Sequence, residues 1–149
     1  MLLENLELLF ARDLEKLKTE ISSYKDENNL WQIRAGILNS GGNLALHLVG
    51  NLKHFVGLVL GEFSYSRERD KEFSNKNIPV ADIIRSIDET ITVVTATLSK
   101  LTHDDIARIY PQKPLGTEMT TANFLLHLYA HLNYHLGQIN YHRRIVEAN

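Results

Sequence analysis

Three histidines spaced four residues apart mark a segment near the C-terminal end of the sequence. They are His127, His131 and His135, and His142 follows one heptad later. Residues i and i+4 of an α-helix lie one above the other on the same face. Two imidazoles placed in this way can reach one metal ion, and a third from another helix would complete an open three-histidine site. His47 is the best candidate for that third ligand.

The chemistry of such a site follows from its ligand number. Three neutral imidazoles leave at least one coordination position for water or substrate, which is typical of catalytic rather than structural sites. Imidazole binds Zn, Ni, Co, Cu and Fe(II), so the ligand type does not select the metal. A single histidine on an apolar helix face is more often a hydrogen-bonded core residue. Several inward histidines at this spacing, matched by one on another helix, favour a metal site.

Other known classes of metal site fit the sequence poorly. A zincin peptidase needs a Glu directly after the first histidine of its motif, but Leu132 follows His131 here. The two Glu-x-x-His elements of a di-iron bundle are absent from the sequence. The chain has no cysteine, which excludes thiolate zinc sites, iron–sulfur clusters and a cysteine nucleophile. Haem ligation by two histidines stays open but has no supporting motif.

Four amphipathic helices are expected to position these residues. Their apolar periodicity predicts helices over residues 2–22, 43–61, from 79 to about 101, and from 120 or 121 to about 146. The sequence shows no convincing strand pattern. The three connections of roughly 15 to 20 residues exceed what simple hairpins need. We therefore predict an all-α fold, a four-helix bundle with long crossover connections, as a single domain over residues 1–149.

The second predicted helix should be the most buried, because apolar residues surround nearly all of it. Its only charge is Lys53. The apolar surface is interrupted by a seam of small and neutral polar residues, namely Asn43, His47, Gly50, Asn51, His54, Gly57 and Gly61. A solvated helix face would normally carry Lys and Glu, so this seam is expected to face the interior, its glycines allowing close helix packing.

The connections are expected to be irregular, with one short extended piece near residues 106–110. The alternating charges of residues 67–72 predict a solvated loop or helical turn. Residues 28–43 are expected to lack regular structure. On the last helix, Asn133, Gly137, Asn140 and Arg144 are expected to face water.

The overall composition of the chain limits the kinds of partner that it could bind. A formal net charge of −2 argues against nucleic acid. The acidic, amphipathic start is no signal peptide, and no apolar run approaches the roughly 20 residues of a membrane span. Together with the absence of cysteine, this predicts a cytoplasmic protein.

Two segments then resemble the DinB/YfiT-like family of small four-helix proteins. They are Asn43-Leu-Ala-Leu-His47-Leu-Val-Gly-Asn51-Leu and His131-Leu-Asn-Tyr-His135-Leu-Gly137-Gln138-Ile139. The length and helix order of the whole chain are compatible with that family, although only these segments are distinctive.

The resemblance implies a divalent metal, commonly zinc or nickel, held by His47, His131 and His135. Family members of understood activity are similar to metal-dependent transferases that use a low-molecular-weight thiol of the bacillithiol or mycothiol type. The resemblance also implies that the protein forms a homodimer. Two alternatives stay open: a non-catalytic, dimeric bundle whose histidine site is structural or vestigial, and, more distantly, a metal-dependent hydrolase.

Residues around the implied triad have several possible roles. Gln138 and Asn51 could orient the ligand imidazoles. His54, His127 and His142 could support the ligands, line a cavity or serve only in packing, and His127 or His142 could also act as a base. Trp31 and Tyr110 lie in connections that could cover the site, although plain packing is the more frequent role of such residues.

Overall fold

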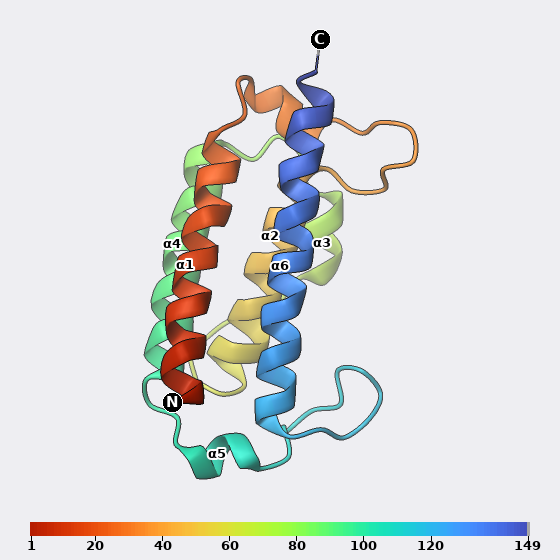
Figure 1. Cartoon of the computed structure of the whole chain (residues 1–149). Coiled ribbons are helices and arrows are strands. Elements are labelled where there is room, and N and C mark those ends of the chain that lie inside the picture. Colours follow the sequence, from red (N-terminus) through yellow and green to blue (C-terminus); the bar gives the residue numbers. More distant parts are fainter. Residues whose placement is uncertain (149) are drawn as a thin grey trace.

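The computed structural model describes residues 1–148, which form an all-helical bundle (Figure 1). Its four long helices are α1 (Leu2–Ser22), α2 (Gly41–Leu52), α4 (Val80–Leu98) and α6 (Thr121–Val146). The shorter helices are η1 (Glu27–Trp31), η2 (Lys53–Leu58), α3 (Arg69–Ser74) and α5 (His103–Ala107). No strand is assigned within residues 1–148, where an isolated bridge joins Ile109 to Thr120. The predicted fold class is confirmed.

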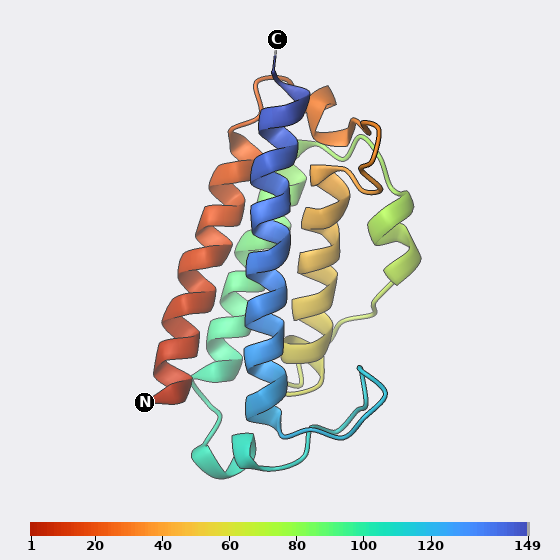
Figure 2. The ribbon, with the colours of Figure 1, turned by 45° about the vertical axis from the view of Figure 1, so that its right-hand side comes forward.

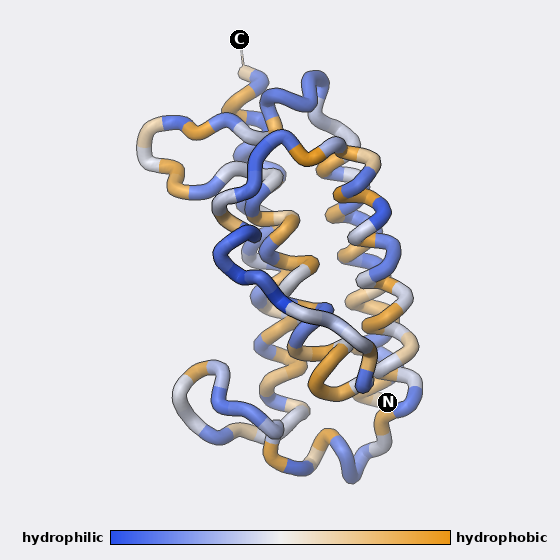
Figure 3. Tube along the Cα trace, turned by 180° about the vertical axis from the view of Figure 1, so that it is seen from behind, coloured by the Kyte–Doolittle hydropathy of each residue, from blue (hydrophilic) through white to orange (hydrophobic). Residues whose placement is uncertain are grey.

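The long helices surround one apolar core. Helix α1 packs against α4 and α6, while α2 packs against α6 and α4 (Figures 1 and 2). Hydrophobic and hydrophilic stretches alternate along the long helices, as expected for helices buried on one side (Figure 3). Helix α2 has no exposed residue, which confirms that it is the most buried helix. Among residues 1–148, no helix is both long and apolar enough to cross a membrane.

Two details of the connections differ from the predictions. Residues 27–31 form the 3₁₀ helix η1, because the Asp26 side chain accepts a hydrogen bond from the Asn28 amide. The predicted extended piece at residues 106–110 is wrong at its start, where Ile106 lies in α5. A capping box between Thr102 and Asp105 begins that helix.

The second predicted helix also differs at both ends. It begins at Gly41 rather than Asn43, because the Ser40 side chain caps it by accepting from the Asn43 amide. Beyond Leu52 the chain continues as the π-helix η2 instead of a regular α-helix reaching Gly61. The first and last long helices were predicted to within one residue.

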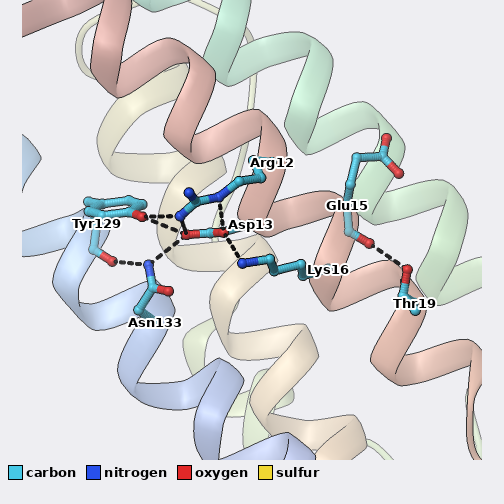
Figure 4. Close-up of polar contacts among 7 residues, drawn as sticks. All are labelled: Arg12, Asp13, Glu15, Lys16, Thr19, Tyr129 and Asn133. Atoms are coloured by element: carbon cyan, nitrogen blue, oxygen red, sulfur yellow. Dashed lines mark hydrogen bonds and ion pairs between the residues drawn. The ribbon is translucent and has the colours of Figure 1, made fainter.

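A buried carboxylate fastens α6 to α1 (Figure 4). Asp13 of α1 is fully buried, and its oxygens accept hydrogen bonds from Arg12, from the Tyr129 hydroxyl at 2.6 Å and from the Asn133 amide at 3.0 Å. Lys16 lies 3.2 Å away. Burial alone would raise the pKa of Asp13, but these donors hold it well below its usual range. The cluster fixes the register of α6, and therefore the height of its histidines in the bundle.

The expectation that four polar or small residues of α6 face water is correct for Asn133, Gly137 and Arg144, which are exposed. Asn140 is half-buried, because its amide donates to Glu20 of α1 at 2.7 Å. Asn133 also reaches inward to Asp13 through its amide nitrogen. Both side chains therefore help to hold α6 on α1.

Candidate metal centre

The structure brings the three predicted ligands together. His47 comes from α2, while His131 and His135 come from successive turns of α6. The Nε2 atom of His131 lies 3.2 Å from Nε2 of His47 and 3.1 Å from Nε2 of His135. One nitrogen of each ring lies within 4.8 Å of the other two, so one ion could contact all three.

These separations fit a single metal ion. Two nitrogens bound at 2.0–2.1 Å to a tetrahedral ion lie about 3.3 Å apart. The two measured nitrogen–nitrogen distances, 3.2 and 3.1 Å, are close to that value. Three imidazoles are also a donor set that divalent zinc and nickel accept. The residues present therefore fit a divalent metal, while its binding stays a prediction.

Hydrogen bonds to the opposite ring nitrogens leave lone pairs facing the cluster. His47 Nδ1 lies 3.0 Å from Glu72 Oε1, and an ionised carboxylate can only accept. His47 must then donate through Nδ1, so in the neutral ring Nε2 carries the lone pair. His135 Nδ1 lies 2.7 Å from Gln138 Oε1 and has the same tautomer. Gln138 therefore fixes the orientation of the His135 ring by accepting this hydrogen bond.

Two of the three histidines, His131 and His135, stay neutral near pH 7. Burial, reinforced by the neighbouring His135 and His47 rings, lowers the pKa of His131 to about 3. Burial also lowers the pKa of His135. Protons therefore compete weakly for these nitrogens in the folded protein. His131 Nδ1 is buried without a hydrogen-bond partner among residues 1–148.

Glu72 is a site residue that the sequence analysis missed. It lies in α3, within the charge run expected to be solvated, yet it is 6 % exposed. Both of its oxygens also accept from Arg67, from Nε at 2.8 Å and from Nη2 at 2.8 Å. Burial opposes ionisation, but the hydrogen bonds from Arg67 and His47 bring the pKa of Glu72 below its ordinary value. The expectation of a solvated run is wrong at these two residues.

Helix α2 is shaped to receive this carboxylate. A Cβ added at Gly50 would overlap the Glu72 carboxylate, so the glycine makes room for it. The Asn43 amide donates to the backbone carbonyls of Glu72 at 2.9 Å and Asn75 at 2.8 Å, which docks α3 onto α2. The only sequence signal was the seam of small and polar residues on α2. That seam was expected to face the interior, but it did not predict the carboxylate that lies against it.

The remaining histidines do not join the cluster. His142 is buried, with Nδ1 2.7 Å from the Tyr24 hydroxyl and Nε2 2.8 Å from the Gln32 carbonyl. Both of its nitrogens are engaged, so it serves in packing rather than as a base. The His127 ring stacks at 6.3 Å from the His131 ring. His54 Nδ1 is buried and unpaired within the described residues.

Two other candidates, Trp31 and Tyr110, contribute to packing, and Asn51 does not contact the cluster through its oxygen. Trp31 covers Gly42, where an added Cβ would meet its ring. Tyr110 is buried and its hydroxyl donates to the Phe55 carbonyl at 2.7 Å. Asn51 Oδ1 is buried without a hydrogen-bond partner among residues 1–148, so Asn51 does not bond directly to a ligand through this atom.

A pocket of about 440 Å³ lies beside the cluster and shares His135 and Gln138 with it. The connection before α2 forms one wall through Ile37 and Leu38, and α6 forms the other through Tyr134 and several further residues. Among the described residues that line it, none is Lys, Arg, Asp or Glu. The arrangement offers a neutral, largely apolar chamber next to a candidate metal ligand.

Fold and site together define an all-α helical bundle with a candidate three-histidine metal centre between two core helices. The chain belongs to the family described as a protein of unknown function, DUF1572, whose family model matches residues 3–149. A comparison with curated proteins finds no match. The family description carries no activity, so the function must be argued from the site.

Proposed function

We propose that this chain is a DinB-like, metal-dependent transferase that joins a low-molecular-weight thiol, of the bacillithiol or mycothiol type, to an electrophilic small molecule. The observation that carries the proposal is the convergence of three imidazole nitrogens from α2 and α6. A carboxylate behind His47 and a neutral pocket beside His135 support it.

In the proposed reaction, the histidines hold the metal and the co-substrate supplies the sulfur. His47, His131 and His135 would hold a divalent ion, zinc or nickel. A bound ion would act as a Lewis acid that favours the thiolate form of a thiol. Because the chain has no cysteine, the attacking sulfur must belong to the co-substrate. That sulfur would lose its proton to solvent and form a bond to carbon, while the leaving group would depart with the electron pair of its own bond to that carbon.

The protein's own contribution is orientation and desolvation. Glu72 and Gln138 fix the ring orientations of His47 and His135 through their Nδ1 atoms. The pocket places apolar side chains, including Ile37 and Ile145, around the space next to His135. A neutral electrophile would be bound there by apolar contact, close to the ligand set and partly shielded from water.

Metal content is the first test. Untagged protein would be reconstituted with Zn²⁺ and with Ni²⁺, dialysed and analysed by plasma mass spectrometry. A His47→Ala/His135→Ala double variant and a His103→Ala control would be treated in parallel. We expect about one ion per chain in the parent and control and none in the double variant. No metal in the parent would overturn the proposal and favour a bundle with structural histidines.

The reaction is tested with the loaded protein. Loss of a chloro-dinitroarene electrophile would be followed with and without added thiol. Thiol-dependent conjugate formation at least about tenfold above the double variant would support transfer. Loss of an ester substrate without thiol, at a similar excess, would instead indicate the hydrolase. Metal binding with neither reaction would indicate a non-catalytic site.

A further inference from the structure

One of the three candidate ligands differs from the other two in what holds its ring. Glu72 accepts a hydrogen bond from His47, and Gln138 accepts one from His135, in each case from Nδ1. Nδ1 of His131 is buried and has no hydrogen-bond partner in the part of the chain that the structure describes. A metal-ligating imidazole almost always donates its other N–H to a carboxylate, a carbonyl or water. His131 therefore needs an acceptor when its Nε2 binds a metal.

Two further buried side-chain atoms have no hydrogen-bond partner within residues 1–148, and both belong to the helix that carries His47. They are Asn51 Oδ1 and His54 Nδ1. Asn51 follows His47 by four residues and is 7 % exposed, and His54 follows Asn51 by three, so all three residues share one face. Buried polar atoms without a partner are rare in native proteins, so a group of them requires an explanation.

The register of the two helices brings Asn51 to the level of the His131 ring. Helices α2 and α6 run antiparallel (Figures 1 and 2). Nε2 of His47 lies 3.2 Å from Nε2 of His131, and further along both helices the rings of Phe55 and Phe124 lie 5.2 Å apart. Asn51 lies midway between His47 and Phe55. It is therefore opposite the part of α6 that begins at His131 and extends toward Phe124.

The missing partner must suit His131 both with and without a metal. In the metal-free cluster, His47 and His135 turn the lone pairs of their Nε2 atoms toward His131 Nε2, at 3.2 and 3.1 Å. His131 therefore donates from Nε2, and its Nδ1 carries the lone pair. When a metal occupies Nε2, the neutral ring carries its proton on Nδ1 instead. An amide oxygen can only accept, whereas a water molecule can donate to Nδ1 in the first state and accept from it in the second.

We propose that one buried water molecule binds between Asn51 Oδ1, His54 Nδ1 and His131 Nδ1, and that Asn51 positions the His131 ring through it. Buried waters typically make about three hydrogen bonds to polar groups that are otherwise unpaired, and these three atoms provide one each. The water does for His131 what Glu72 and Gln138 do for the other two ligands. The inference rests on the metal centre of the proposed function, but the water itself belongs equally to the metal-free protein.

Crystal structures of the metal-free and the zinc-loaded protein test the water directly. We expect an ordered water within hydrogen-bonding distance, about 2.7–3.2 Å, of all three atoms in both structures. Absence of ordered density between these atoms in both structures, or a direct hydrogen bond from His131 to Asn51, would overturn the proposal. A parent protein that binds no zinc would overturn the proposed function instead, and the metal-free structure would still decide whether the water is bound.

Zinc affinity, measured by competition with a fluorescent chelator, tests the positioning role. Asn51→Leu should weaken it about tenfold, because the His131 ring loses the group that holds its water. Asn51→Asp keeps an accepting oxygen and should recover most of the affinity. Asn140→Leu is the matched control, because it removes a 2.7 Å hydrogen bond to Glu20 elsewhere on α6 and should bind zinc like the parent. Unchanged affinity in Asn51→Leu, or an equal loss in Asn51→Asp or Asn140→Leu, would overturn the role of Asn51.

Side-chain NMR of the parent protein makes the test independent of whether the variants fold. Nitrogen-15 spectra of histidine rings distinguish protonated from unprotonated ring nitrogens. We expect the His131 proton on Nε2 without metal and on Nδ1 with zinc, where the hydrogen bond to water should slow its exchange with solvent. A proton on Nδ1 in both states, or exchange as fast as that of the exposed His103 ring, would overturn the proposal.

Discussion

Replacing Glu72 with Gln should weaken metal binding about 10- to 100-fold, although Glu72 is not expected to contact the metal. The carboxylate accepts from His47 Nδ1 at 3.0 Å and from two Arg67 nitrogens, each at 2.8 Å. Gln keeps one carbonyl oxygen and puts an NH₂ group in place of the other. At least one of the three donors would then face another donor, and His47 would lose the negative charge that makes its ring a better ligand.

The same change should lower the free energy of unfolding of the metal-free protein by about 2–3 kcal/mol. The side chains of Glu72 and Arg67 are only 7 % and 11 % exposed, so solvent cannot replace the lost interaction. Losing a hydrogen bond between charged groups costs about 1.5–3 kcal/mol. The remaining contacts of α3, including those from Asn43, are unchanged and should keep the fold.

Two measurements separate these effects. Zinc affinity would be obtained by competition with a fluorescent chelator, and stability by urea unfolding of metal-free protein. Glu68→Gln is the matched control, because Glu68 is 63 % exposed and pairs only with Lys71 in the described structure. It should change stability by less than about 0.5 kcal/mol. Unchanged zinc affinity in Glu72→Gln, whatever its stability, would refute the role of Glu72 in positioning His47.

Three further variants test other parts of the structure. His131→Ala should leave the metal-free protein folded but abolish the zinc-induced rise in melting temperature, measured by differential scanning fluorimetry. In the parent we expect this rise to be about 5–10 °C when zinc is in hundredfold excess over Kd. His127→Ala is the control and should retain the rise. His142→Phe should lower the free energy of unfolding by about 2–3 kcal/mol in urea, because the Tyr24 hydroxyl and the Gln32 carbonyl each lose a hydrogen-bond partner, yet it should leave metal content unchanged. Asp13→Asn should cost about 2–4 kcal/mol near pH 7. Because the pKa of the folded carboxyl is lowered from 3.8, its stabilisation is present above that value and is lost as pH falls toward the folded pKa. The difference from the parent should therefore shrink between about pH 5 and pH 3; an equal difference at both would contradict this account.

The helices and two of the candidate ligands could be predicted from the sequence because helical periodicity is a local property. Apolar spacing located α1 and α6 almost to the residue, and Thr120 marked the start of α6 by capping it. His131 and His135 share a face because they are four residues apart on one helix. His47 was already the candidate for the third ligand before the resemblance was considered, and the fold brings its Nε2 to 3.2 Å from Nε2 of His131.

Only the tertiary structure could identify Glu72 and Arg67 as part of the site. An alternating charge run looks the same in sequence whether water or a buried imidazole satisfies it. What decides between them is the docking of α3 onto α2, through the Asn43 amide and the space left by Gly50. Likewise, the helical spacing of α6 predicts that His142 faces inward, as His131 and His135 do, and cannot tell a packing residue from a candidate ligand. Contacts with Tyr24 and Gln32, more than a hundred residues away in sequence, assign it to packing. Local spacing determines which face a side chain occupies, and long-range packing determines what it meets there.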